Sequence, residues 1–306
     1  MRTGARFICR MGAYDFHQEA ASRLAGAYLY NTENTPTHMK VKDRIIIVTG
    51  AGSGMGRALT SQLLSKGATV VAIDRNAITL EETRALATTG TERLLTRVVD
   101  ITDRQALVAL RTELSAGASG VDGIINNAGI IQPFVPVSML DDAVIERVMQ
   151  VNFYGTLNMV RTFLPHLLTR PQAHIVNVSS MGGFLPVPGQ TIYGASKAAV
   201  KLFTEGLHAE LADTAVRVTL VLPGAVDTNI TRNSGVEMPP PDPSAPAIPM
   251  ISAEKAAGMI IDAMEADRYR VLVGQDARFM DFIYRLHPER AAKFIREKLR
   301  GLLKKP

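Results

Sequence analysis

The chain has 306 residues, 46% of them hydrophobic and 21% charged, with a net charge of +5. This composition is typical of a globular protein, and it excludes a disordered, collagen-like or disulfide-stapled chain. The single cysteine, Cys9, excludes an internal disulfide and a cysteine-built zinc site, and it favours a reducing, cytoplasmic location. The basic residues are scattered as far as the C-terminal segment, so no nucleic-acid partner is expected, and no apolar stretch is long enough to predict a membrane span.

Residues 1–38 lack the pattern of the rest of the chain. Arg2, Arg6 and Arg10 flank no continuous apolar core, so a secretory signal is not indicated. Three acidic residues also disfavour a targeting peptide. We expect that Met39 is the natural start, or that residues 1–38 form a loosely ordered extension.

From residue 44 onward, short β-branched runs alternate with longer helical patterns, as parallel βαβ units require. Strands are predicted at Arg44 to Thr49, Thr69 to Asp74, Leu94 to Val99, Gly123 to Asn126, His174 to Ser179, Val216 to Val221 and Tyr269 to Val273. Helices are predicted at Gly54 to Lys66, Arg104 to Leu114, Asp141 to Leu168, Ile192 to Leu211 and Ala253 to Glu265. Most of the strands are continuous apolar runs, which suits strands covered by helices on both faces. The sequence therefore predicts one doubly wound α/β (Rossmann) domain over residues 39–275, with a parallel sheet of about seven strands.

Two segments fall outside this alternation. Residues 233–250 contain six prolines and follow a strand end, where open α/β sheets bind ligands, so we predict a substrate loop there. Residues 276–306 are predicted to be a basic amphipathic helical tail. Its apolar positions are Phe279, Phe282, Ile283, Leu286, Ala291, Ile295, Leu299 and Leu302. Such a stripe usually docks on its own domain or on a second subunit, and the alternative is contact with an anionic membrane surface.

A glycine-rich turn, Thr49 to Gly56, joins the first strand to the first helix. Glycines there let backbone N–H groups approach a pyrophosphate at a helix N-terminus, although such a turn can also be only a tight connection. Asp74 closes the second strand, where a carboxylate can hold both hydroxyls of an adenosine ribose. A 2′-phosphate ~4 Å from it would be repelled by about 4 kcal/mol, so NAD is favoured over NADP. Arg75 leaves NADP open, because it could pair with that phosphate.

A tyrosine and a lysine stand one helical turn apart at Tyr193 and Lys197. An ammonium beside a phenol lowers the phenol pKa from its usual value of about 10. Ser179 and Ser180 end the preceding strand at the edge of the sheet where the glycine turn also lies. A hydroxyl, a phenol and an ammonium are therefore predicted to converge, the alternative being an ordinary surface pair.

Six segments taken together resemble the short-chain dehydrogenase/reductase family over roughly residues 40–275. They are Thr49 to Gly56, Asn126 to Gly129, Asn152, Ser179-Ser180, Tyr193 to Lys197 and Pro223 to Thr228. The resemblance implies hydride transfer between NAD(H) and a secondary alcohol or ketone. It implies that Ser180 binds the substrate oxygen, Tyr193 moves its proton, Lys197 lowers the pKa of Tyr193 and binds the nicotinamide ribose, and Asn152 organises a water relay. The cofactor contacts that we expect are Thr49, Gly50, Ser53, Gly54, Met55, Gly56, Asp74, Arg75, Asp100, Ile101, Asn126, Ala128, Gly129, Tyr193, Lys197, Pro223, Gly224, Val226 and Thr228.

The residues expected to face the substrate are Ser180, Gly182, Phe184, Leu185, Gln190 and Tyr193. Because most of them are apolar, a bulky apolar substrate is favoured, although Phe184 and Leu185 could equally support the site from behind. No metal ion is expected, and the resemblance implies a homodimer or homotetramer. Two other functions stay open: an NADP-dependent ketone reductase, and a nucleotide-sensing binding protein without catalysis, which four intact catalytic residues disfavour.

Overall fold

The computed structural model describes residues 38–115, 120–237 and 250–298. The predictions for residues 1–37, for most of the proline-rich loop and for Leu299 and Leu302 lie outside this part of the chain. Within it, no helix has both the length and the apolar character needed to cross a bilayer. The same residues contain no group of three or more side chains that could hold a metal ion.

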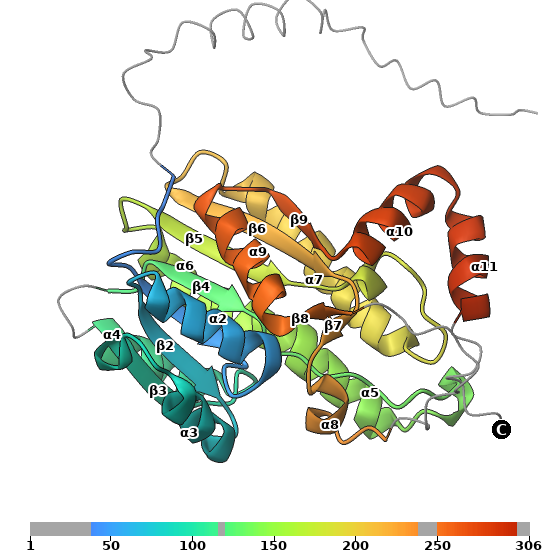
Figure 1. Cartoon of the computed structure of the whole chain (residues 1–306), viewed down its shortest axis with the longest axis horizontal. Helices are drawn as coiled ribbons and strands as arrows, with labels where there is room; N and C mark the ends of the chain where they lie inside the picture. Colours follow the sequence, from blue (N-terminus) through green and yellow to red (C-terminus); the bar gives the residue numbers. More distant parts are fainter. Residues whose placement is uncertain (1–37, 116–119, 238–249, 299–306) are drawn as a thin grey trace, which may run out of the picture. The chain divides into compact units, whose positions relative to one another are not determined.

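Seven parallel strands form one sheet in the order β3-β2-β1-β4-β5-β6-β9 (Figure 1). They are β1 (Ile45–Thr49), β2 (Thr69–Asp74), β3 (Leu94–Val98), β4 (Gly123–Asn126), β5 (Ala173–Val178), β6 (Val216–Pro223) and β9 (Arg270–Val273). A separate parallel pair joins β7 (Val226–Asp227) to β8 (Ile251–Ser252). All seven predicted strands are present, and the predicted doubly wound α/β fold is confirmed.

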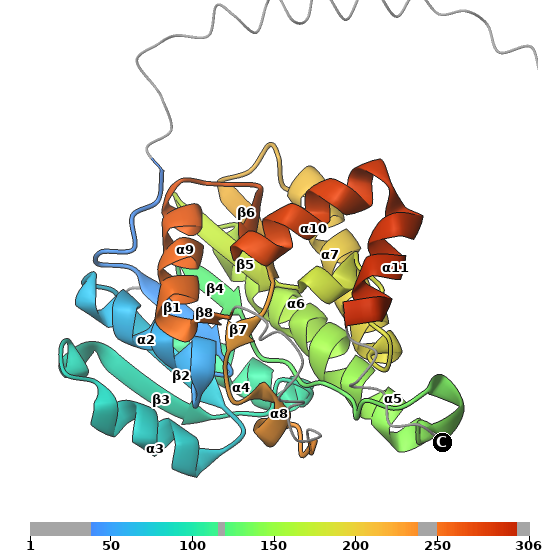
Figure 2. The same cartoon turned by 45° about the vertical axis from the view of Figure 1, so that its right-hand side comes forward.

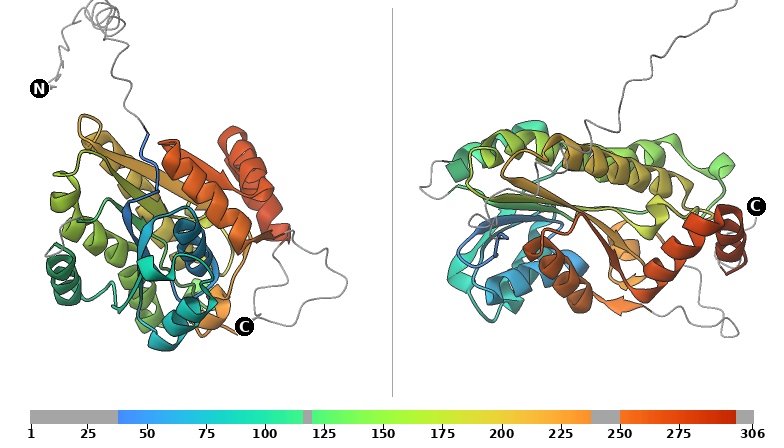
Figure 3. Two further views of the ribbon diagram at one scale, coloured as in Figure 1. Left: turned by 60° about the vertical axis from the view of Figure 1, so that its left-hand side comes forward. Right: turned by 90° about the horizontal axis from the view of Figure 1, so that it is seen from above.

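Helices cover both faces of the sheet, and Figures 2 and 3 show the three layers. One face carries α2 (Gly54–Ser65), α3 (Ala77–Leu86) and α9 (Ala253–Glu265), and the other carries α4 (Arg104–Ser115), α6 (Thr156–Leu167) and α7 (Thr191–Glu210). Successive side chains along a strand point to opposite faces of the sheet and belong to different hydrophobic cores. Ile46 packs with Leu59 of α2, whereas its neighbour Ile47 packs with Phe163 of α6. Both faces of the inner strands are thus buried, which explains their continuous apolar sequences, whereas the edge strand β3 is partly exposed.

The long helix predicted over residues 141–168 is divided in the structure. It consists of α5 (Asp142–Met149), a π-helical segment η3 (Gln150–Gly155) and α6. Short helices complete the chain: η1 (Thr91–Arg93), η2 (Val137–Met139), η4 (Met181–Gly183) and α8 (Ile230–Asn233). π-helical turns are rare and often mark functional positions. This one contains Asn152, a predicted catalytic residue.

The C-terminal segment forms two helices, α10 (Gln275–Leu286) and α11 (Pro288–Lys298), which pack together (Figure 1). Pro288 is favoured at a helix start and disfavours helical backbone at the residue before it, so the chain breaks at His287. The predicted apolar stripe of α10 is not docked on its own domain, because Phe279, Phe282 and Leu286 are 57%, 61% and 56% exposed, and its contact with a second subunit or a membrane stays a prediction. The helix instead buries the side that meets η4, including Met280.

The strand order reverses between β1 and β4, and ligands of doubly wound sheets bind beyond the carboxyl ends of the strands at such a point. The loops that follow β1, β2, β3 and β4 therefore define the place to look for a site.

Candidate active site

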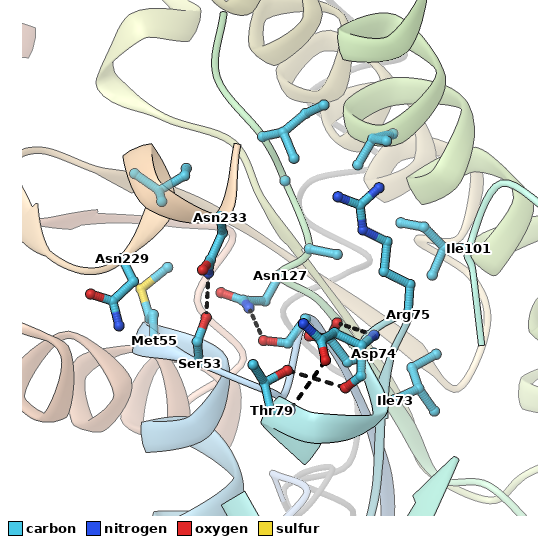
Figure 4. Close-up of a pocket in the computed structure, with 18 of the residues that line it drawn as sticks. Ser53, Met55, Ile73, Asp74, Arg75, Thr79, Ile101, Asn127, Asn229 and Asn233 are labelled. Atoms are coloured by element: carbon cyan, nitrogen blue, oxygen red, sulfur yellow. Dashed lines mark hydrogen bonds between the residues drawn. The ribbon is translucent and has the colours of Figure 1, made fainter. Parts of the chain in front are cut away.

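A pocket lies beyond the carboxyl ends of these strands, and Figure 4 shows the side chains around it. Eleven of the predicted cofactor residues line it: Gly50, Ser53, Gly54, Met55, Asp74, Arg75, Asp100, Ile101, Ala128, Gly129 and Thr228. Ten further lining residues were not predicted: Ile73, Asn76, Thr79, Val99, Asn127, Ile130, Val151, Asn229, Ile230 and Asn233. The last three come from the segment that includes α8, so this short helix forms one wall of the pocket.

The glycine turn is shaped to receive an anionic group. Gly50 and Gly54 have positive φ angles of 67° and 49°, which side chains rarely adopt. A Cβ at Gly50 would also lie 2.9 Å from Ala128 Cα. Helix α2 begins here with Ser53, whose side chain makes no capping bond, and its first turn carries no acidic residue. The first N–H groups of α2 therefore remain free to bind a pyrophosphate.

Asp74 is held at the edge of the pocket by two backbone hydrogen bonds. Its Oδ2 accepts from Gly52 N at 3.0 Å and its Oδ1 accepts from Asn76 N at 3.0 Å. A Cβ at Gly52 would come within 2.9 Å of Asp74 Oδ2 and 2.2 Å of Thr79 Oγ1, so this close approach requires glycine. The Arg75 side chain extends away from the Asp74 carboxylate in Figure 4. The charged group nearest to the glycine turn at this end of the pocket is therefore the Asp74 carboxylate, which is negative.

Several predicted cofactor residues shape the pocket from behind rather than line it. Thr49 Oγ1 accepts from the backbone N–H groups of Asn127 and Ala128, at 2.9 Å each. Asn126 donates to the Asn177 side chain at 2.8 Å inside the sheet. A Cβ at Gly56 would meet the Gly50 carbonyl oxygen at 2.0 Å. The other predicted residues outside the pocket wall are Tyr193, Lys197, Pro223, Gly224 and Val226.

Lys197 lies directly behind the pocket wall. Its side chain is buried, its Nζ donates to the Val178 carbonyl at 3.0 Å, and burial lowers its pKa to about 8. A Cβ placed on Gly129, which lines the pocket, would lie 3.1 Å from Lys197 Nζ and 3.3 Å from Asn152 Oδ1. A side chain at position 129 would therefore crowd these two polar groups, which lie directly behind the pocket wall.

Tyr193 and Ser180 lie side by side, since a Cβ on Gly182 would be 3.4 Å from the Tyr193 ring and 3.5 Å from Ser180 Oγ. Ser180 Oγ accepts from Gly182 N at 3.0 Å, so η4 fixes its position. Burial raises the pKa of Tyr193, and the side chain of Ser180 lowers it by less. Lys197 Nζ donates to the Val178 carbonyl, and the lowering of the Tyr193 pKa by Lys197 stays a prediction.

Asn152 ties the loop after β4 to α7. Its Nδ2 donates to the Ile130 carbonyl and to Ser196 Oγ, each at 2.9 Å, while its Oδ1 accepts from Ile130 N at 2.8 Å. Ser196 Oγ in turn donates to the Tyr193 carbonyl at 2.7 Å. Sequence reasoning missed Ser196, although it lies between Tyr193 and Lys197 on the same helix.

The predicted substrate residues divide into two groups. Ser180, Gly182 and Tyr193 lie together, since a Cβ on Gly182 would be 3.4 Å from the Tyr193 ring and 3.5 Å from Ser180 Oγ. Leu185 is fully buried against Met280, Ala291 and Ile295 of the C-terminal helices, so it supports the site and does not face an open cavity. The remaining two are also packed on neighbours: Phe184 lies against the Tyr284 ring, and buried Gln190 donates to the Gln132 carbonyl at 2.6 Å.

Asp276, at the start of α10, is a second residue that sequence reasoning missed. Its Oδ2 accepts from Ala225 N at 2.7 Å, and a Cβ on Gly224 would overlap its carboxylate. It therefore holds the turn that follows β6 and leads to Thr228. A single acid in a helical tail gives no sequence signal for such a contact.

Comparison with known proteins agrees with this geometry. Residues 44–238 match the model of the short chain dehydrogenase family. The provisionally named oxidoreductase SadH of Mycobacterium tuberculosis is 35% identical over 251 residues, which are 79% of this chain and 90% of that protein.

Solved structures show the same fold. A short chain dehydrogenase from Burkholderia cenocepacia in complex with NADP matches with a TM-score of 0.70 and 30% identity, over 84% of this chain and 99% of that one. A short chain dehydrogenase/reductase from Burkholderia phymatum in complex with NAD matches with a TM-score of 0.69 and 26% identity, over 81% of this chain and 96% of that one. The chain therefore belongs to the short-chain dehydrogenase/reductase family, and it is an oxidoreductase of that family.

Proposed function

We propose that this protein transfers a hydride between NAD(H) and a secondary alcohol or ketone, with Ser180, Tyr193, Lys197 and Asn152 as its catalytic residues. The observation that carries the proposal is that Tyr193, on the helix that also bears Lys197, lies beside Ser180 at the start of η4. Lys197 reaches the pocket through Gly129. A proton-transferring pair thus stands beside a pocket suited to a dinucleotide.

The residues present fit a dinucleotide at this site. The uncapped start of α2 offers N–H groups to a pyrophosphate, and Asp74 offers a carboxylate to ribose hydroxyls. Lys197 uses one backbone acceptor and has two more N–H groups, which would donate to the second ribose. NAD, when bound, would supply the group that accepts or returns the hydride.

The proton is transferred by side chains of the protein. Ser180 Oγ would hold the substrate oxygen next to the Tyr193 hydroxyl. In oxidation the Tyr193 phenolate takes the hydroxyl proton of the alcohol, and in reduction the Tyr193 phenol gives that proton to the carbonyl oxygen. Asn152 acts through the backbone of Ile130 and through Ser196, which orient the same helix. Its role in a water relay stays part of the proposal.

The test is a turnover assay with purified protein, NAD or NADP, and a panel of secondary alcohols from small polar to bulky apolar. Reduced-cofactor absorbance is followed, and Tyr193→Phe is the control. NAD-dependent turnover that the control lacks supports the proposal. Measurable NAD binding without turnover of any alcohol in the panel, or of the matching ketones with NADH, would favour the nucleotide-sensing alternative.

The NAD preference rests on the charge beside the ribose site. Because Asp74 lies at the pocket edge and Arg75 points away from it, a 2′-phosphate would meet a carboxylate. Asp74→Ala should narrow the NAD over NADP ratio of kcat/KM by tenfold or more, whereas Arg75→Ala should leave NAD use nearly unchanged. An unchanged ratio in Asp74→Ala would refute the assignment of the NAD preference to Asp74.

The apolar substrate stays part of the proposal: Phe184 itself packs on the Tyr284 ring, so the support comes from the apolar surroundings of η4 and not from a ring that lines the pocket. We extend the proposal to a homo-oligomer in the cytoplasm, which light scattering and cell fractionation would test.

Contact with an anionic lipid surface is a further part of the proposal. It is supported by exposed Phe279, Phe282 and Leu286 of α10, which stand beside exposed Arg278 and Arg285. The protein should sediment with vesicles that contain anionic lipid and not with neutral ones, and Phe282→Ser should weaken that binding. Equal recovery with both kinds of vesicle would refute it.

A further inference from the structure

The first turn of α7, which carries Tyr193, is capped from a distant part of the chain. Helix starts are usually capped by the side chain of the residue just before them. In α7 that residue is Gln190, and it makes no such bond. Instead, the N–H groups of Ile192 and Tyr193 donate to Gln132 Oε1, at 2.8 and 3.0 Å. Gln132 precedes Ile192 by 60 residues and lies in the loop after β4.

The orientation of the Gln132 amide is fixed by all of its partners. The two helix N–H groups can only donate, so they require the amide oxygen. The Gly189 carbonyl can only accept, and Gln132 Nε2 donates to it at 3.0 Å. The Gln132 carbonyl also accepts from Gln190 Nε2 at 2.6 Å. Because Gln132 is fully buried, water does not substitute for these bonds.

The same loop forms part of the pocket wall. Gly129 and Ile130 line the pocket, and the Ile130 backbone holds the Asn152 side chain on both sides. Gln132 follows Ile130 by two residues. The loop after β4 is therefore bonded to the pocket wall at one end and to the Tyr193 backbone at the other.

We propose that Gln132 is a positioning residue that sets the place of Tyr193 relative to the cofactor pocket. The proposal rests on the proposed function, in which Tyr193 moves the proton. Gln132 bonds to the Tyr193 backbone and acts through it on the reacting groups. Only an amide of this length supplies an oxygen to the helix and an N–H to Gly189 together.

Three variants separate these contributions. Gln132→Met matches the length of the side chain and supplies neither bond. Gln132→Glu keeps an acceptor for the two helix N–H groups; its ionised form loses the donor to Gly189 and adds a buried charge, whereas its protonated form can still donate. Gln132→Asn keeps the amide but is one methylene too short, and it replaces Gln132→Met if that variant does not fold.

The matched control is Asp103→Ala. Asp103 Oδ1 accepts from Gln105 N and Ala106 N, at 2.9 and 3.1 Å, at the start of α4, which contributes nothing to the pocket wall. Its removal therefore costs a helix start the same two bonds without touching α7. A loss of kcat that results only from a weakened helix start should appear in this control as well.

The measurements are kcat and KM for the alcohol, the Kd of NADH, the pH profile of kcat, and amide hydrogen exchange at Ile192 and Tyr193. Gln132→Met should lower kcat by about tenfold to a hundredfold, as expected for a misplaced catalytic group, and leave the Kd of NADH within about twofold. The pH profile of kcat in Gln132→Met should shift, because the surroundings of the Tyr193 phenol change. Gln132→Glu should recover most of the wild-type kcat, and its Ile192 and Tyr193 amides should stay protected from hydrogen exchange.

Several results would overturn the proposal. The first is a Gln132→Met variant whose kcat falls no further than that of Asp103→Ala. The second is a loss of NADH affinity in Gln132→Met that parallels its loss of kcat. The third is a Gln132→Glu variant whose kcat is no higher than that of Gln132→Met. If the wild type turns over no alcohol, the proposed function fails separately. Hydrogen exchange in Gln132→Met then still tests the cap, because fast exchange at Ile192 and Tyr193 is expected and unchanged exchange refutes it.

Discussion

Buried charged side chains at the two edges of the sheet differ in how many hydrogen-bond partners they have. At the amino edge, Asp122 precedes β4 and is almost completely buried, and its carboxylate accepts from Arg170 at 2.7 and 3.0 Å and from Ile45 N at 3.0 Å. Arg44 lies 3.5 Å away as a second counterion. At the carboxyl edge, Lys197 is just as buried, and its only bond within the described residues is to the Val178 carbonyl.

The difference shows how a buried ion can be assigned a role. A buried charge is costly unless its surroundings satisfy it. Asp122 has a full set of partners and can serve stability alone. Lys197 has spare N–H groups beside a pocket, and its lowered pKa, about 8, records the cost of its burial. Unsatisfied bonding capacity is therefore the better guide to chemistry than burial itself.

The largest effect is expected at the carboxyl edge, in Tyr193→Phe. Loss of the phenol removes the proton-transferring group, so kcat should fall by about 10²- to 10⁴-fold. The Kd of NADH and the urea midpoint should stay near the wild-type values, because the ring remains. Turnover within tenfold of wild type would remove Tyr193 from the proposed mechanism.

Asp122→Asn should give the opposite result, a loss of stability without a loss of chemistry. It weakens charged hydrogen bonds to Arg170, and the expected cost is about 2 kcal/mol in the free energy of unfolding. Urea unfolding measures this cost, and kcat at a temperature where the variant is folded should match the wild type. Glu113→Gln, which removes the exposed pair with Arg97, is the control and should cost less than about 1 kcal/mol. A larger loss in the control would contradict the comparison.

The pH dependence of the two reaction directions should differ. Because burial raises the pKa of Tyr193, the phenolate is scarce at neutral pH and the phenol is abundant. Alcohol oxidation needs the phenolate, so its kcat/KM should rise by about tenfold per pH unit below that pKa, while ketone reduction stays flat. Rates measured from pH 7 to pH 9.5 test this. A flat oxidation profile would show that Tyr193 is not the base.

The smallest effect concerns a second buried group at the amino edge. His174 is fully buried, with Nε2 2.8 Å from Thr219 Oγ1 and Nδ1 3.4 Å from Asp267 Oδ1. Burial lowers its pKa below the usual 6.5, although the Asp267 carboxylate opposes this. The unfolded chain therefore binds the proton more readily, so the contribution of neutral His174 is present above pH 6.5 and is lost as pH falls below it.

His174→Gln should accordingly flatten the stability profile between pH 7 and pH 5, by about 1 kcal/mol. Urea midpoints at both pH values measure the change. Asp267 titrates lower, since its pKa is also lowered, and it limits stability only under more acidic conditions. An unchanged slope in the variant would show that His174 does not control this range.

The sequence predicted the sheet almost completely, because most of its strands are continuous apolar runs, which a sheet covered on both faces buries. The glycine turn and Asp74 were predicted for the same local reason, since their roles depend on neighbours within one βαβ unit. Gln132 and Asp276 were missed, because each acts on the backbone of a segment 50 or more residues away. The sequence could not choose between docking of the α10 stripe on the domain and contact with another surface, because periodicity marks an apolar stripe without saying which side meets the domain.

The bond from Asp276 to Ala225 has a consequence for how the protein is made. Synthesis on the ribosome proceeds from the N-terminus, so β1 to β6 and the glycine turn emerge before residue 276. The turn after β6 acquires its anchor only when α10 follows, and Leu185 acquires its cover only with α10 and α11. A nascent chain can thus form the glycine-turn end of the pocket first, and its last segment completes the surroundings of Ser180 and Tyr193, where we propose that the proton is transferred.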